Sequence, residues 1–550
     1  MARTRRDKTT LSAFGHRAGR IGLFAAVGYA LVGGLVVAGV AYGFLRLIMP
    51  IDRGRAAAEI EVTRVALTVV AGVGGVVALV IAYRRQRDLE QSKFVERFGA
   101  AAAQLGATDV AVRIAGVYAM AGVADETDGP RRQQCIDVLC GYLRLPYSPE
   151  LGGNHQTKDI RKYPAVEPSG FENEQHFEYR QNDREVRRTI VRVIADHLLP
   201  GTEYAWSPYN LDFRTSRLEA ADFDNVTFSG TARFDNATFV GGARFGGATF
   251  TGTASFHQAN FSGDSWFHKA AFTSATSFGE AIFSGDASFG EASFSGDTTF
   301  GDATFSGETS FGEATFSSDI SFDGATFGND TLFRGATFTG TTSFRSVTFT
   351  GDAWFHGASF DNNSWTWFHE AIFARTAVFG GAIFTGDARL DRVTFTGNAW
   401  FQGATFSRES SFHEATFTRN ASFSAARFTG AAWFYGAAFT GDTSFDKAAF
   451  DNEALFRGVT FTETASFRNA AFGGPAWFHG ATFTGNASFA QVLFQGRTSF
   501  ALVDFGTGQI LFTEPRQWGP PLPEFDWSEG GEGKPENVEP VEWPPAVATA

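Results

Sequence analysis

The sequence predicts a mainly β solenoid built from short repeats, preceded by a transmembrane helical hairpin and a small α-helical module. Two observations carry this prediction. Phenylalanine accounts for 61 of the 550 residues, and 52 of these lie between Phe213 and Phe505 at spacings of five and then six residues. A fixed short period is typical of repeats that stack to bury a shared core. Two long apolar runs precede this region, each long enough to span a bilayer.

The apolar runs, residues 21–49 and 65–83, predict two membrane-spanning helices. No small-residue cleavage site follows the first run, so we expect an anchor rather than a removed signal peptide. Six Lys and Arg lie in the tail 1–20, three in the loop 50–64 and five in residues 84–97. This basic excess on both flanks predicts a multi-pass protein of the cell membrane, with both termini cytoplasmic and 50–64 external. A buried helical hairpin in a soluble domain remains the alternative.

Three segments connect the hairpin to the repeats. Residues 84–147 show apolar positions at helical spacing and predict the helical module. Residues 148–182 are polar and contain Pro and Gly, which is typical of a linker. Residues 183–205 begin as an amphipathic helix, which we expect to cap the open first coil of the solenoid.

The phenylalanine ladder predicts strands over residues 206–512. Only Leu218 and Leu390 replace Phe at a ladder position. Helical repeats need apolar residues three and four apart, so they are excluded. Alternation in a strand places Ala303 and Phe305 inside and Thr304 outside, and the Gly that often follows suits a tight corner. Phe360 to Phe368 spans eight residues, which we interpret as a two-residue corner bulge, with a binding feature as the alternative.

The run Ala221-Asp222-Phe223-Asp224-Asn225 resembles the pentapeptide-repeat family, whose units read A-(D/N)-L-x-x. The stretches 97–106 and 112–119 resemble the helical module that joins a membrane hairpin to such repeats in actinobacterial proteins. The resemblance implies a four-sided, right-handed β-helix. One extra residue in every second unit implies coils of 22 residues, or about 13 coils. We expect the Pro-, Glu- and Gly-rich tail 513–550 to lie over the last coil and then become disordered.

No catalytic, cofactor or metal site is predicted. Cys135 and Cys140 lie five apart in a predicted helix and are interpreted as buried structural thiols. The sequence contains no phosphate-binding loop, nucleophile elbow or zinc-protease motif. Six histidines follow a ladder Phe, but no two are 22 residues apart, so they do not stack into a metal site. These are His257, His268, His356, His369, His413 and His479.

Tryptophans beside ladder phenylalanines are expected to point outward. Strand preference is the simpler explanation for them, and a partner surface is the alternative. Trp266, Trp354 and Trp400 fall on one face, and Trp367, Trp433 and Trp477 on the opposite face. Because they lie several coils apart, we expect no contiguous aromatic patch.

An acidic run provides the candidate interaction surface. No Lys or Arg lies between Glu280 and Asp323. At 22 residues per coil, the carboxylates should stack in columns about 4.8 Å apart. The columns serve solubility in the simplest interpretation; mimicry of a phosphate backbone and weak cation binding are alternatives. The candidates are Glu280, Asp286, Glu291, Asp297, Asp302, Glu308, Glu313 and Asp319.

The formal charge of −13 and the pI of 5.3 argue against direct nucleic-acid binding. The sequence therefore favours a non-enzymatic, membrane-anchored scaffold that binds an unknown protein, with homo-oligomer formation left open. The alternative is a DNA mimic that binds a DNA-handling enzyme such as a topoisomerase. A glycan-processing enzyme would need clustered Asp, Arg and Tyr on one face, a pattern that the sequence lacks.

Overall fold

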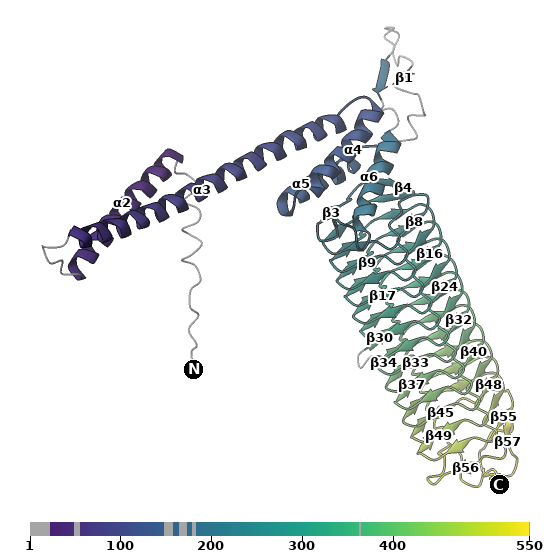
Figure 1. Ribbon diagram of the computed structural model, residues 1–550. Coiled ribbons are helices and arrows are strands. Elements are labelled where there is room, and N and C mark those ends of the chain that lie inside the picture. The colour runs from purple at the N-terminus through teal and green to yellow at the C-terminus, as the bar shows by residue number, and fades with distance from the viewer. Residues whose placement is uncertain are drawn as a thin grey trace. The chain divides into compact units, whose positions relative to one another are not determined.

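The computed structural model describes residues 23–48, 56–147, 158–163, 173–178, 183–361 and 365–548. The chain divides into two compact units, Met1–Ala100 and Ala101–Ala550 (Figure 1).

Two helices make up the described part of the first unit. Helix α2 (Leu23–Ile48) covers the first apolar run. Helix α3 (Ala56–Leu105) begins inside the range expected as a loop, so residues 56–64 are helical instead. It also continues past Tyr83 without a break, because the charged residues that follow are good helix formers. Among the described residues, no helix combines the length and the apolar character that a membrane crossing needs.

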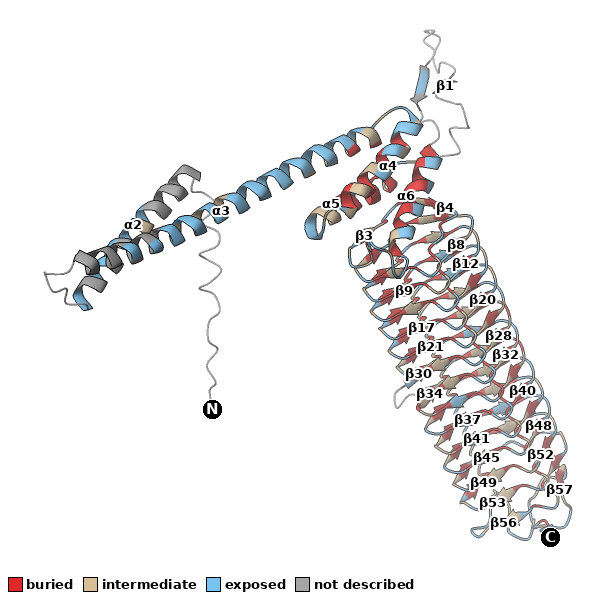
Figure 2. Ribbon diagram, viewed as in Figure 1, coloured by how far each residue is buried: buried red, intermediate tan, exposed pale blue. Residues whose placement is uncertain are grey.

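Helices α4 (Val110–Asp125), α5 (Gly129–Leu143) and α6 (Asp183–Leu198) form the helical module of the second unit. Their apolar faces meet in a core that is red in Figure 2, where Met120, Ile136 and Ile190 are fully buried. The end of α3 packs on α4 at Gly116, where any Cβ would lie only 2.6 Å from the backbone N of Leu105. The helix expected as a cap at 183–205 is thus part of the module and ends at Leu198.

A buried ionic cluster ties the three helices together. The Asp183 carboxylate of α6 accepts from Arg113 Nη1 at 2.6 Å and from Arg187 Nε at 2.7 Å. Tyr142 of α5 donates its hydroxyl to the same carboxylate at 2.6 Å. Because buried charges are costly unless paired, this cluster fixes how the helices pack.

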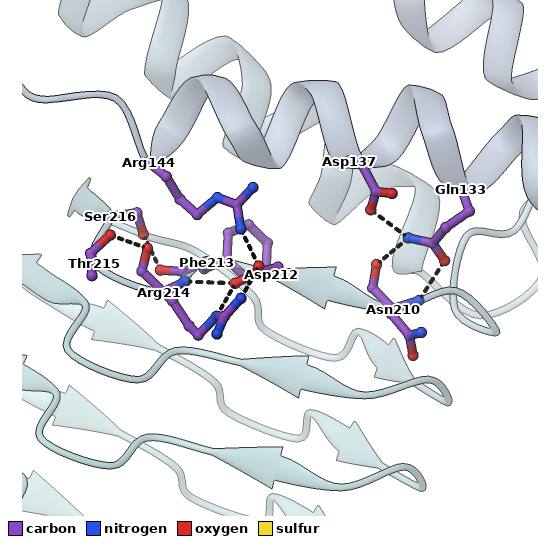
Figure 3. A network of polar contacts seen from close by, with 9 residues as sticks. All are labelled: Gln133, Asp137, Arg144, Asn210, Asp212, Phe213, Arg214, Thr215 and Ser216. Atoms are coloured by element: carbon purple, nitrogen blue, oxygen red, sulfur yellow. Dashed lines mark hydrogen bonds and ion pairs between the residues drawn. The ribbon is translucent and has the colours of Figure 1, made fainter.

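The module covers the first coil of the solenoid (Figure 3). Gln133 of α5 donates Nε2 to the backbone oxygen of Asn210 at 2.8 Å and accepts from its N–H at 3.0 Å. Arg144, at the end of α5, pairs with Asp212. The hydrogen bond from Arg214, with its positive charge, holds the pKa of Asp212 below its usual value. The sequence predicted a cap from the last helix alone, but α5 and α6 both contact the first strands.

The predicted linker contains a two-stranded antiparallel hairpin, formed by β1 (Lys158–Tyr163) and β2 (Asn173–Glu178). Lys162 and Glu174 pair across it at 2.8 Å. The other residues of 148–182 lie outside the described part of the chain.

Four parallel sheets form the faces of a right-handed solenoid of about 14 turns. One coil consists of β14 (Thr276–Ser277), β15 (Ile282–Phe283), β16 (Ala287–Ser288) and β17 (Ser293–Phe294), which lie on the first, second, third and fourth face in that order. The four-sided repeat fold expected from the sequence is confirmed.

Most strands are only two residues long. The second face runs from β4 (Arg217–Glu219) to β51 (Thr482–Phe483), the third from β8 (Ala243–Arg244) to β57 (Val538–Glu539), and the fourth from β5 (Thr227–Phe228) to β56 (Gln517–Trp518). The first face consists of β3 (Leu211–Asp212), β6 (Ala232–Arg233), β10 (Ala254–Ser255), β14, β18 (Thr298–Thr299), β22 (Ile320–Ser321), β26 (Thr342–Ser343), β30 (Trp365–Trp367), β34 (Asp387–Arg389), β38 (Ser410–Ser411), β42 (Ala432–Trp433), β46 (Ala454–Leu455), β50 (Ala476–Trp477) and β54 (Thr498–Ser499).

Stacked phenylalanines fill the solenoid. Each coil contributes four rings, and every ladder Phe is buried. Phe278 stacks on Phe300 of the next coil, with ring centroids 4.8 Å apart, and meets Phe289 of its own coil edge-on at 5.5 Å. Aromatic rings favour both arrangements. The predicted alternation is confirmed, because Ala303 and Phe305 are buried and Thr304 is exposed.

Up to the last coils, where Ala487 pairs with Ile510 and Ile510 with Val538, the register repeats every 22 residues, as in the pairing of Phe283 with Phe305, with two exceptions. The first coil has 21 residues and pairs Leu218 with Phe239, because Leu218 and Phe223 are five apart where the ladder rule requires six. One later coil carries two extra residues, which pairs Ser343 with Trp367. This matches the expected insertion, although its residues 362–364 lie outside the described part of the chain.

Two different corner positions place different demands on the backbone. Left-handed φ angles occur at the second residue after a ladder Phe, as at Glu280 with φ of 55°. The glycines expected to turn the corner have another role. At Gly307 any Cβ would lie 2.5 Å from the carbonyl carbon of Gly285, so glycine is required there by the close approach of consecutive coils.

The carboxy-terminal tail forms a cap and is described through residue 548, contrary to the predicted disorder. Strand β57 pairs with β55 (Ile510–Leu511) on the third face. Phe525 stacks on Phe500 at 4.8 Å, and Trp543 packs edge-on against Phe525 at 5.1 Å. These aromatic side chains extend the core, which explains why the tail is ordered despite its Pro and Gly content.

Candidate interaction surface

The eight predicted carboxylates are all exposed and lie at the corners of the solenoid. Strand pairing places residues 22 apart on consecutive coils, so Glu280 lies above Asp302 and Asp297 above Asp319. Asp286 with Glu308 and Glu291 with Glu313 complete the four columns. The stacking that the period predicts is therefore present, but the columns lie at different corners and do not form one patch.

Half of these carboxylates occupy left-handed corner positions. Glu280, Glu291, Asp302 and Glu313 have φ between 54° and 58°. Their backbone N–H groups bond to the next coil, as from Glu280 to the oxygen of Gly301 at 2.8 Å. Their neighbours are polar: Gln258 donates Nε2 to Glu280 at 2.9 Å, and Lys269 lies 3.5 Å from Glu291. These side chains are ordinary solvated corner residues.

Three of the other four carboxylates, Asp286, Asp297 and Asp319, have a structural role that the sequence did not predict. Asp286 Oδ1 accepts from the N–H of Glu308 at 2.9 Å, and Asp319 Oδ1 from that of Thr341 at 2.8 Å. Asp297 accepts from the hydroxyl of Ser318. The carboxylates thus satisfy polar groups of the next coil at corners between strands. This bonding offsets part of the repulsion between like charges.

A groove of about 730 Å³ runs along the first face, and Asp297 and Asp319 are the only two of the eight candidates that line it. The sequence pattern did not predict this groove. Its signal is a small residue at every outward position of the five consecutive strands after Arg233: Ser255, Ser277, Thr299, Ser321 and Ser343.

The tryptophans of the first face form no contiguous aromatic patch, as expected, because other outward residues separate Trp367, Trp433 and Trp477. The outward residues of consecutive strands are Trp367, Arg389, Ser411, Trp433, Leu455 and Trp477. The guanidinium of Arg389 bridges the gap above Ser411, 4.9 Å from the ring of Trp365 and 5.2 Å from that of Trp433. The rings of Trp365 and Trp433 and the guanidinium of Arg389 therefore pack against one another.

The histidines that follow a ladder Phe lie beside ordinary polar and aromatic neighbours. Among the described residues, no group of three or more His, Cys, Asp or Glu side chains is placed to hold a metal ion. His413 stacks on Tyr435 at 5.1 Å, and His268 lies 3.5 Å from Glu291.

Both cysteines are buried in the helical module, as expected. Burial raises the pKa of Cys135 to about 11 and that of Cys140 to about 12. Thiols with such values are protonated at neutral pH and are poor nucleophiles.

Comparison with known proteins identifies the repeat. A family model described as pentapeptide repeats (9 copies) matches seven overlapping stretches that together run from residue 213 to 492, about half of the chain. No curated protein and no solved structure matches the chain.

Proposed function

Because the chain belongs to the pentapeptide-repeat family, whose members are generally non-enzymatic interaction proteins, we propose that it is a membrane-anchored scaffold. It presents its solenoid to a protein partner in the cytoplasm. The proposal rests on what the side chains of the solenoid do, because most of them build the solenoid itself. Phe fills the interior, Ser and Thr cover the faces, and the clustered carboxylates bond to neighbouring coils.

Membrane anchoring is supported by the apolar surface of the first unit. Leu35, Phe44 and Leu79 are 66%, 65% and 72% exposed on α2 and α3. Large exposed apolar surfaces mark contact with another molecule or with lipid. The basic residues on both flanks support cytoplasmic termini.

Fractionation of cells tests the anchor. The full chain should stay with the membranes after an alkaline carbonate wash, and a chain that starts at residue 86 should move to the supernatant. A reporter fused to the carboxy terminus should be active in the cytoplasm. Release of the full chain by carbonate would contradict the anchor, and reporter activity outside the cell would contradict the orientation.

A DNA mimic is the second candidate, and the absence of Lys and Arg between Glu280 and Asp323 favours it. The later coils favour it less, because acids there pair with arginines: Arg389 with Glu409 at 2.9 Å and Arg392 with Glu414 at 3.0 Å. A supercoiling assay separates the candidates. Inhibition of a topoisomerase by micromolar protein would support the mimic, and no inhibition would leave the scaffold.

A further inference from the structure

The groove on the first face ends at a tryptophan side chain on its carboxy-terminal side. Its floor consists of Ser255, Ser277, Thr299, Ser321 and Ser343. Trp367 pairs in register with Ser343, so the track of small side chains ends at a tryptophan. The guanidinium of Arg345 lies 4.2 Å from the ring of Trp367. The groove therefore has a defined length along the solenoid.

The groove is acidic over most of this length. Asp235, Asp297 and Asp319 line it, and Arg233 at the opposite end is its one lining cation. Asp297 and Asp319 are exposed, and within the described residues neither pairs with Lys or Arg. Their hydrogen bonds come from Ser318 and from the backbone N–H of Thr341, which are neutral donors. Their negative charge therefore stays available to a ligand.

We propose that this groove binds an extended, lysine- or arginine-rich segment of a partner protein. This inference rests on the proposed scaffold function and names the site and the partner chemistry. The groove follows six strands, or about 24 Å at a coil spacing of about 4.8 Å, which fits about seven residues of extended chain. The small hydroxyl side chains let a peptide backbone approach the sheet and offer it hydrogen bonds. The carboxylates select for cationic side chains.

The probe is a fluorescein-labelled nonapeptide of alternating lysine and serine, titrated by fluorescence anisotropy with the full-length protein in detergent. The double variant Asp297→Asn with Asp319→Asn should weaken binding roughly tenfold. Asparagine keeps the Oδ1 acceptor that Thr341 uses, so the coil is preserved. The matched control, Asp286→Asn with Glu308→Gln, removes two charges from a different corner of the same coils and should change binding less than about twofold.

A second pair of variants tests the groove without changing the charge: one blocks it, and the other is a control on another face. Ser321→Trp places an indole on the floor, and the fold accepts it because Trp433 and Trp477 hold the equivalent outward position. It should weaken binding by at least about tenfold, whereas Ser466→Trp on the third face should leave binding unchanged. Equal losses in both charge variants, or unchanged binding in Ser321→Trp, would overturn the proposal and indicate diffuse electrostatic attraction.

Capture of a partner from membranes separates two outcomes: a wrong binding site and a wrong scaffold function. If Ser321→Trp and the wild type capture the same partner from membranes, the groove is not the binding site and the scaffold function stands. If the wild type binds the peptide in the groove but captures no protein from membranes, the scaffold function is contradicted while the binding site stands.

Discussion

The Asp319 carboxylate accepts a hydrogen bond at 2.8 Å from the backbone N–H of Thr341, one coil further along the solenoid. The same contact joins Asp286 to Glu308 at 2.9 Å and Asp330 to Asp352 at 2.9 Å. Asp before a strand of the first or the third face is therefore part of the ladder that holds the coils together.

Asp319→Ala should weaken this corner by about 1 kcal/mol, because the amide loses its acceptor. Hydrogen exchange of the Thr341 amide should then be about fivefold faster. Asp319→Asn keeps the Oδ1 acceptor and should leave the exchange rate near that of the wild type. Equal exchange in the two variants would show that the carboxylate oxygen does not protect this amide.

The phenylalanine columns should tolerate leucine far better than alanine. Phe300 is fully buried between stacked neighbours, so Phe300→Ala should cost about 3 to 5 kcal/mol. Phe300→Leu should cost less than about 1.5 kcal/mol, because Leu390 fills an equivalent ladder position in this chain. Denaturation by urea measures both. A loss as large for leucine as for alanine would contradict the view that volume, more than ring stacking, stabilises the core.

The repeat could be predicted from the sequence because its signal is local. A buried Phe every five or six residues sets the strand, the face and the register together, as for Phe283 and Phe305. The groove and the contacts of Arg389 with two tryptophans could not be predicted in this way. They depend on which side chains fill outward positions on neighbouring coils. Arg389 joins Trp365 to Trp433 only because its guanidinium extends over Ser411.

The end caps could be predicted only in part. The tail was expected to lie over the last coil, which is confirmed, and then to become disordered from its Pro, Glu and Gly content, yet Trp543 packs on Phe525. The cap at the other end depends on α5 as well as α6, through the contact between Gln133 and Asn210. Both contacts join residues that are distant in sequence and follow no period.

The ionic cluster of the helical module should be sensitive to the loss of its acid. Asp183→Asn removes the carboxylate that Arg113 and Arg187 share and should destabilise the module by about 3 to 5 kcal/mol. The exposed residue Arg188 provides the control, because Arg188→Ala should change stability by less than about 0.5 kcal/mol. Limited proteolysis in the module measures the difference. Equal resistance in the two variants would contradict the structural role of Asp183.

The buried cysteines predict a loss of stability at high pH. Unfolded thiols ionise from about pH 9, whereas the folded thiols of Cys135 and Cys140 have pKa values raised to about 11 and about 12. Their contribution is therefore fully present below pH 9 and is lost as the pH rises toward 11 and 12. Between pH 8 and pH 11, the melting temperature of the wild type should fall more steeply than that of Cys135→Ala with Cys140→Ala. Parallel curves would contradict the burial of the thiols.

Cross-linking in isolated membranes, followed by pull-down of the full chain, tests directly whether the membrane-anchored solenoid binds a protein partner. The wild type should capture a defined protein. Capture should fall when the carboxylates of residues 280–323 are neutralised, and should persist when the same number of acids is neutralised after Arg334. Capture of no protein, or equal capture by both variants, would show that the solenoid does not bind a partner through these carboxylates.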